Sequence, residues 1–395
     1  MVTPPIARTL HELSAVCALS LVALLLVSSP IRADELTVEP SISVQGRVDD
    51  NPLLRTTNHE TTYIGTVSPQ VALHDKNDQL DLKFSASANL RAYSGLANTN
   101  SDDEIGSLDL NYLVTELTSL GLNASVNRIT LLDQLVDNNG QLTRPARSTN
   151  VSVAPSTTFL LSPVNQFQIS GFFTNQTYDA PQLVNYREYG GSLSWTHALN
   201  DLLTGALSVI AERAEPDDNT SNGTDIYAAE ASISYTFPND IKVALRGGPE
   251  LIRRDIVFPG QSADQLGFRL QASVKGSLDE LTDISARVTR ESQPTSAGGV
   301  TRHDSFHLDA SRKLGPRLSA NVSADYVMGD AKSSAADNLD NYLNLSVGAK
   351  WQITELSSFN LSYSYRREAF INQQRRAISN GVYLTFQHAF VPRPQ

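Results

Sequence analysis

The chain alternates apolar and polar residues with a period of two over unusually long stretches. Between residues 226 and 237 the odd positions are apolar or aromatic, and the even positions from Glu230 onward are Glu, Ser, Ser and Thr. In a helix the apolar residues of such a run would point all round the axis, whereas a strand places them on one face. Runs of this kind therefore predict β-strands with one apolar and one polar face.

Eighteen segments of this kind can be marked along the chain. Most extend for about ten residues or more, as a tilted membrane strand requires, whereas strands of soluble proteins run nearer to about five or six. The predicted strands cover residues 37–48, 62–74, 79–93, 104–116, 121–132, 150–160, 166–178, 186–199, 203–212, 226–237, 241–253, 265–277, 283–290, 305–313, 318–328, 341–353, 359–369 and 377–390.

The connections between these segments alternate in length. Short ones fall at residues 75–78, 162–165, 200–202, 238–240, 278–280 and 315–317, and long ones at 49–60, 95–103, 133–147, 216–223, 255–263, 292–302 and 329–338. A soluble β-sandwich has no reason to alternate in this way, but outer-membrane barrels do. The sequence thus predicts an all-β fold: a single transmembrane antiparallel up-and-down β-barrel of about 18 strands (range 16–20), with short periplasmic turns and longer extracellular loops.

The N-terminus carries one apolar run, from Val16 to Ser28, followed by Ile31-Arg32-Ala33. The run is shorter than the roughly 18 residues of a membrane helix, and a small residue follows it, which is the layout of a secretory signal peptide. We expect residues 1–33 to be this signal peptide and residues 34–395 to form the barrel in the outer membrane. Cys17 is the only cysteine and lies in the removed segment, so no disulfide or thiolate site is expected in the mature chain.

The charge balance and the missing motifs exclude several kinds of protein. Removal of residues 1–33 leaves 29 basic and 41 acidic residues, a net charge of −12 against −11 for the whole chain, which argues against nucleic acid as a partner. The chain has no Gly-rich phosphate loop, no Gly-x-Ser-x-Gly and no His-Glu-x-x-His. We expect no catalytic site, no cofactor and no metal. The expected partners are outer-membrane lipid, small hydrophilic solutes or polysaccharide, and the barrel-assembly machinery, which reads an aromatic residue such as Phe390 near the end of the last strand.

If the apolar face of each strand meets lipid, the polar face lines the interior. In three consecutive predicted strands this face carries a candidate basic stripe of Lys242, Arg246, Arg269, Lys275 and Arg287. The two strands before them contribute a candidate acidic stripe, Glu212 and Glu230. Neighbouring strands lie about 4.8 Å apart, so the stripes are expected side by side on one wall. They would either favour anionic solutes in a water-filled or partly plugged pore, or form ion pairs across the wall that merely hydrate the interior.

The opening of the mature chain reads Val38-Glu39-Pro40-Ser41-Ile42-Ser43-Val44-Gln45-Gly46-Arg47-Val48-Asp49-Asp50-Asn51-Pro52. It resembles the first strand and Asp-Asp-Asn loop of a group of proteobacterial outer-membrane barrels known as β-barrel porins or as exopolysaccharide- and exosortase-associated barrels. The resemblance implies an outer-membrane location and a link to envelope polysaccharide, and it supplies no catalytic residues. The same Asp-Asp-Asn is also what a plain polar loop start would contain.

The expected function is a porin-like channel with a charged polar lumen, linked to exopolysaccharide export. One alternative is a non-conducting envelope scaffold or assembly partner. A second is an outer-membrane hydrolase, because Ser305, His307 and Asp309 share one strand face, although successive positions on that face are about 7 Å apart. His303 and His307 would lie roughly 13 Å apart on a strand, too far for one metal ion. Loop 133–147 is expected to be external, with an inward-folded constriction as the alternative.

Overall fold

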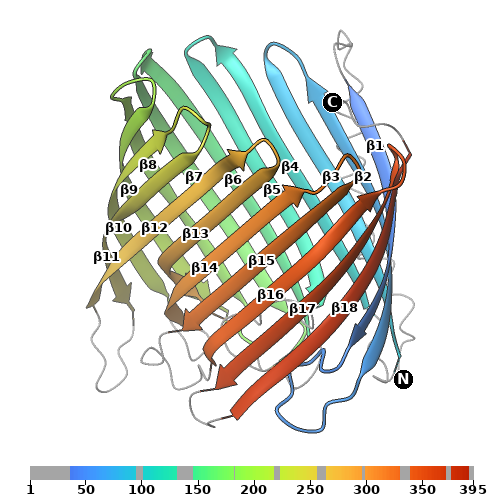
Figure 1. Ribbon diagram of the computed structural model, residues 1–395. Coiled ribbons are helices and arrows are strands. Elements are labelled where there is room, and N and C mark those ends of the chain that lie inside the picture. The colour runs from blue at the N-terminus through green and yellow to red at the C-terminus, as the bar shows by residue number, and fades with distance from the viewer. Residues whose placement is uncertain are drawn as a thin grey trace, which may run out of the picture.

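The computed structural model describes residues 36–94, 101–130, 146–181, 183–217, 223–255, 264–295, 299–329, 339–370 and 375–390. These ranges form eighteen β-strands (Figure 1): β1 (Thr37–Asp49), β2 (Thr62–Lys76), β3 (Leu80–Ser94), β4 (Ser101–Thr115), β5 (Thr118–Thr130), β6 (Arg147–Ser162), β7 (Asn165–Tyr178), β8 (Tyr186–Ala198), β9 (Leu203–Pro216), β10 (Thr224–Thr236), β11 (Lys242–Arg254), β12 (Asp264–Asp279), β13 (Thr282–Pro294), β14 (Val300–Lys313), β15 (Leu318–Gly329), β16 (Leu339–Gln352), β17 (Ser357–Phe370) and β18 (Arg375–Ala389). No helix in the described ranges is long and apolar enough to cross a membrane.

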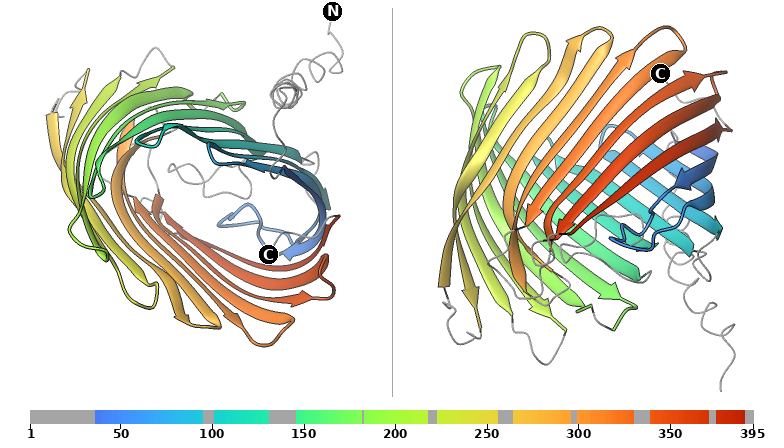
Figure 2. Two further views of the ribbon diagram at one scale, coloured as in Figure 1. Left: turned by 90° about the horizontal axis from the view of Figure 1, so that it is seen from above. Right: turned by 60° about the horizontal axis from the view of Figure 1, so that its bottom comes forward.

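The sheet closes on itself. Each strand pairs antiparallel with its neighbours in sequence, and β1 also pairs antiparallel with β18, from Ser41 opposite Ala389 to Asp49 opposite Gly381. An even number of strands allows this closure, because the first and last strands then run in opposite directions. The left view of Figure 2 looks along the resulting ring. The predicted antiparallel up-and-down barrel of 18 strands is therefore confirmed.

The connections give the barrel two different ends. At one end, here called the turn end, two to five residues join consecutive strands, and β1 begins and β18 finishes there. At the other end, here called the loop end, the connections have four to sixteen residues. In Figure 1 the turn end is at the top and the loop end at the bottom. The predicted alternation of short turns and longer loops is thus present in the structure.

The two faces of the wall differ in character. Large apolar side chains point outward and are exposed on strand after strand, as with Leu207 and Val209 of β9, which are 55% and 52% exposed. The alternate residues point inward and include most of the charged side chains within the strands, such as Glu212 and Glu230. An outward apolar surface of this extent is far larger than soluble monomers expose.

One long loop was predicted wrongly. The sequence prediction placed a loop at 292–302, but β13 continues to Pro294 and β14 begins at Val300, leaving only 295–299 between them. β13 and β14 pair with each other up to Pro294 opposite Val300. The end of this hairpin does not follow the barrel wall, so its residues do not alternate between an apolar and a polar face, and the sequence pattern missed it.

The expected signal peptide, 1–33, and nearly all of loop 133–147 lie outside the described residues.

Candidate functional site

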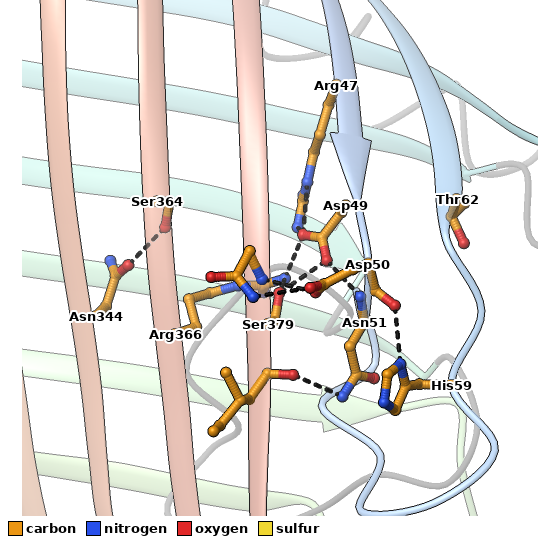
Figure 3. A network of polar contacts seen from close by, with 12 residues as sticks. Arg47, Asp49, Asp50, Asn51, His59, Thr62, Asn344, Ser364, Arg366 and Ser379 are labelled. Atoms are coloured by element: carbon orange, nitrogen blue, oxygen red, sulfur yellow. Dashed lines mark hydrogen bonds and ion pairs between the residues drawn. The ribbon is translucent and has the colours of Figure 1, made fainter.

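The junction where the barrel closes carries a buried charged cluster at the loop end, here called the seam network (Figure 3). Its centre is Asp49, the last residue of β1, which is fully buried. One carboxylate oxygen accepts hydrogen bonds from the Nη2 atoms of Arg47 and Arg366 at 2.5 and 2.6 Å. The other accepts from the Ser379 hydroxyl at 2.7 Å and from the Asn51 backbone N–H at 2.9 Å. Two guanidinium groups compensate this carboxylate, as a buried charge requires.

Asp50 and Asn51 bind the loop that follows β1 to β18. The Asp50 carboxylate accepts hydrogen bonds from the backbone N–H and the side-chain amide of Asn380 at 2.7 and 2.8 Å. The Asn51 side-chain amide donates to the carbonyls of Ile378 and Arg55 at 2.9 and 2.8 Å, and its oxygen accepts from the Arg55 N–H. Each member of the Asp-Asp-Asn triplet thus makes a separate set of contacts, and together they fix the direction in which the loop leaves β1.

That direction is inward. Leu54, 7% exposed, packs with Tyr342 of β16 and Ala377 of β18, both on the lumen face of the wall. The backbone at Leu54 has a φ of 48°, which a leucine rarely adopts. The left view of Figure 2 shows this loop, in blue, within the ring of strands. The loop 50–61 therefore narrows the interior at the loop end.

The sequence contained the Asp-Asp-Asn triplet but not its role. A triplet of this kind at a strand end is also what a polar turn contains, and Arg366, Ser379 and Asn380 lie more than 300 residues away. Only closure of β1 against β18 brings them together. One feature of the sequence could have pointed to this cluster. Arg47 and Arg366 lie on the predicted inward faces of the first and seventeenth strands, and only one strand separates these two once the ring closes.

The two candidate stripes meet as an ion-pair network on the lumen wall. Arg269 of β12 donates to Glu212 of β9 at 2.9 Å, and its Nε atom lies 3.5 Å from Glu230 of β10. Arg246 of β11 also pairs with Glu230. The side chains of Arg269, Glu212 and Glu230 are at most 15% exposed. Four of the seven predicted stripe residues thus neutralise one another across four neighbouring strands.

The other three basic residues are arranged differently. Lys242 and Lys275 lie directly opposite each other in the β11–β12 register near the turn end, and Arg287 faces His307 in the β13–β14 register. All three side chains are exposed. No described residue forms an ion pair with any of them. Among the five residues of the predicted basic stripe, only these three are therefore without an ion-pair partner in the described ranges.

Lys275 also borders a hollow in the lumen wall with a volume of about 370 Å³. The hollow spans the turn-end halves of β12 to β15 and is lined by inward-facing Ser277, Asp283, Asp309 and Asn321. Small hydroxyl and amide groups with one Lys and two Asp residues offer both donors and acceptors. Such a surface can contact small polar solutes.

His303 and His307, which the sequence analysis considered, lie in different surroundings. The two ring nitrogens of His307 contact the carboxylates of Asp325 and Asp309, and no contact joins the ring to the Ser305 hydroxyl in the described part of the chain. His303 is buried at the loop end, with neither ring nitrogen hydrogen-bonded to a described residue. No group of three or more His, Cys, Asp or Glu residues suited to a metal ion occurs in the described ranges. The Ser–His pair that the hydrolase alternative requires is not formed.

No known protein family and no curated protein matches the chain. Similar solved structures include the outer membrane channel DcaP of Acinetobacter baumannii, with a TM-score of 0.49 and 9% identity over 90% of this chain and 97% of that one. OccAB4 of Acinetobacter baumannii has a TM-score of 0.48 and 11% identity over 92% and 100%. The outer membrane protein opdK of Pseudomonas aeruginosa has 0.45 and 8% over 90% and 99%. With TM-scores below 0.5, none of these likenesses says what this chain binds or conducts.

Proposed function

We propose that the protein is an outer-membrane barrel that forms a porin-like channel for small hydrophilic solutes. The observation that carries this proposal is the opposite character of the two faces of one closed wall, apolar outside and charged inside. In a bilayer every strand edge must be paired, and a closed barrel satisfies this requirement. The outward leucines, valines and aromatics then meet lipid, and the inward charges need water or ion partners.

The position of loop 50–61 favours the passage of small solutes over the passage of polymers. Its packing against β16 and β18 takes up part of the cross-section at the loop end. The link to exopolysaccharide export rests on the resemblance of residues 38–52 alone. Swelling of proteoliposomes with sugars of graded size separates the two. Uptake limited to mono- and disaccharides supports the small-solute channel, and passage of long dextrans supports polysaccharide export.

We assign an anion preference to Lys242, Lys275 and Arg287. They carry positive charge on the lumen wall without an ion-pair partner in the described ranges, whereas Arg246 and Arg269 are neutralised by glutamates. Charged side chains that line a narrow pore without an ion-pair partner raise the local concentration of ions of the opposite sign. The selectivity element is thus narrower than the five-residue basic stripe expected from the sequence.

The deciding experiment is single-channel recording of the full mature chain in planar bilayers. Discrete conductance steps, with anions passing more readily than cations in a salt gradient, support the proposal. A well-folded barrel without conductance would instead support the scaffold alternative. Hydrolysis of phospholipid that is lost in His307→Ala would support the hydrolase.

A further inference from the structure

His307 lies between two carboxylates on the lumen face of β14. Its Nδ1 atom is 2.5 Å from Asp325 Oδ1, and Asp325 stands directly opposite it in the β14–β15 register. Its Nε2 atom contacts the carboxylate of Asp309, two residues further along the same face of β14. A neutral imidazole has one N–H group and one acceptor nitrogen, and only the imidazolium ion donates from both nitrogens. The two contacts together therefore require the charged form of His307.

The carboxylate of Asp325 is held by a row of side chains that crosses the neighbouring strands. Its second oxygen accepts a hydrogen bond from the Asn344 amide of β16 at 3.2 Å. The Asn344 oxygen in turn accepts from the Ser364 hydroxyl of β17 at 2.9 Å, as Figure 3 shows. Each of these residues stands directly opposite the next one in the strand register. The wall itself thus fixes one of the two acceptors of the imidazole.

Another histidine of the lumen wall shows what a single carboxylate requires. The Nε2 atom of His74 lies 3.0 Å from Asp81 Oδ1, and its other ring nitrogen forms no ion pair with a described residue. A neutral imidazole can donate this one hydrogen bond. Among the histidines whose side chains the structure describes, His307 is the one with a carboxylate at both ring nitrogens.

Arg287 completes the group of charges around His307. It stands directly opposite His307 in the β13–β14 register, and its exposed guanidinium forms no ion pair in the described ranges. On the lumen face, β13, β14 and β15 place three charged side chains within two residues of His307 or of the residues opposite it, namely Arg287, Asp309 and Asp325. The other neighbours on this face are uncharged: Ser285, Thr289, Ser305, Ser323 and Val327.

The net charge of this group depends on the imidazole. With His307 protonated, Arg287 and His307 contribute +2, Asp309 and Asp325 contribute −2, and the sum is zero. With His307 neutral the sum is −1, and one carboxylate faces a lone pair instead of a donor. The side chains of His307 and Asp309 are 46% and 53% exposed, so they face the water of the lumen. The change in charge therefore acts on ions that pass this part of the wall.

We propose that His307 is a selectivity-determining residue of the channel: its protonated ring neutralises Asp309 and Asp325 so that Arg287 attracts anions, and its deprotonation weakens the preference for anions. The proposal rests on the channel proposed above and adds His307 to the residues that set its selectivity. Histidine has an ordinary pKa of about 6.5, whereas carboxylates, lysines and arginines ordinarily keep their charges between about pH 6 and pH 9. A change of selectivity within this range is therefore the signature of an imidazole.

The test is the reversal potential of single channels of the full mature chain in a KCl gradient, measured at pH 6 and at pH 9. We expect the anion-to-cation permeability ratio to be about twofold higher at the lower pH. His307→Gln should give the lower ratio at both pH values, because its amide carries no charge. His307→Arg should give the higher ratio at both, because its guanidinium stays protonated.

His197→Gln is the matched control. His197 lies on the outward face, where its ring stacks on Trp195 and contacts the Asn165 side chain at 2.9 Å. This variant should keep the pH dependence of the parent protein. Two outcomes would overturn the role of His307 and leave the channel itself in place. One is a conducting parent protein with the same ratio at both pH values, and the other is a His307→Gln variant that keeps the full change.

The charge of the ring is also measured without ion flow, by NMR of the folded barrel in micelles with isotope-labelled histidine. At pH 6, the ring signals that disappear in His307→Gln should come from two protonated nitrogens. One unprotonated nitrogen among these signals would overturn the proposal whether or not the barrel conducts. The expected spectrum from a barrel without conductance steps would instead refute the channel, and with it any role of His307 in selectivity.

Discussion

The Asp49 carboxylate accepts a hydrogen bond from Arg366 at 2.6 Å and thereby ties the end of β1 to β17 across the intervening β18. The contact links residues more than 300 positions apart in the chain. It closes the ring at the loop end, where the β1–β18 pairing reaches its last residue pair. Because the carboxylate is fully buried between two guanidinium groups, its loss leaves uncompensated positive charge.

We therefore expect Asp49→Asn to destabilise the barrel by about 3–5 kcal/mol. The measurement is the temperature at which the folded form, seen as the faster band on an unheated detergent gel, converts to the unfolded band. Asp264→Asn is the matched control, since its pair with Arg253 is more than half exposed on both sides and is expected to be worth at most about 1 kcal/mol. Equal shifts in the two variants would contradict a special role for the seam network.

Asn51→Ala is expected to release loop 50–61 from β18. The variant loses the amide bonds to Ile378 and Arg55, and buried hydrogen-bonding groups left without partners cost about 1–3 kcal/mol. A freed loop no longer occupies a fixed part of the lumen, so single-channel conductance should rise and become noisier. Asn58→Gly is the control, because its φ of 54° suits glycine and the loop should stay in place. Unchanged conductance in Asn51→Ala would show that this loop does not limit flow.

Neutralising Lys242 and Lys275 together should weaken the preference for anions. The two lysines oppose each other on the lumen wall, and their field acts on any ion that passes. We expect the anion-to-cation permeability ratio to fall roughly two- to threefold in Lys242→Gln/Lys275→Gln at low salt, with a smaller effect at high salt. Arg253→Gln/Arg290→Gln removes the same net charge from the outward face and should leave the ratio unchanged. Equal effects of the two pairs would refute the assignment.

Arg269→Gln should destabilise the barrel because it leaves Glu212 without its ion-pair partner and Glu230 with one partner fewer. Removing one partner of a buried ion pair typically costs about 3–5 kcal/mol. A second change, Glu212→Gln, removes one of the stranded charges and should restore part of the unfolding temperature. The double-mutant cycle measures the coupling directly. Additive losses in the double variant would mean that the pair contributes nothing as a pair.

Gly267→Val should displace the tip of the β13–β14 hairpin, which lies over β12 and whose Ser292 hydroxyl donates to the Glu250 carboxylate of β11 at 2.8 Å. The added side chain occupies the space between Arg302 and Glu250, at a cost of about 1–3 kcal/mol for overpacking. Because the displaced tip no longer contacts Glu250, a cysteine introduced as Ser292→Cys should react with a soluble maleimide much faster in Gly267→Val than in the parent protein. Gly46→Val is the control, since nothing lies within 4 Å of the added Cβ atom. A Ser292→Cys rate that does not change in Gly267→Val would show that the tip is not held over β12.

The sequence by itself determined the class of fold. When apolar residues recur with a period of two over long segments, a strand is the only regular structure that places them on one face. The alternating connection lengths then indicate that these strands form an up-and-down barrel. It also determined which side chains point inward, including Glu212, Glu230 and Arg269. These properties depend on neighbours in the chain, which a linear pattern records.

Tertiary structure alone decided what the inward residues do. Arg269 reaches Glu212 three strands away, Asp49 meets Arg366 only because the ring closes, and β13 leaves β12 at Leu270 because Val300 finds buried apolar partners on β9 to β11. All of these contacts depend on register and on the curvature of the wall, and the approach of the β13–β14 hairpin to β11 also depends on the absence of a Cβ atom at Gly267. A period of two assigns a residue to a face, but it carries no information about the residue that approaches that face from across the barrel.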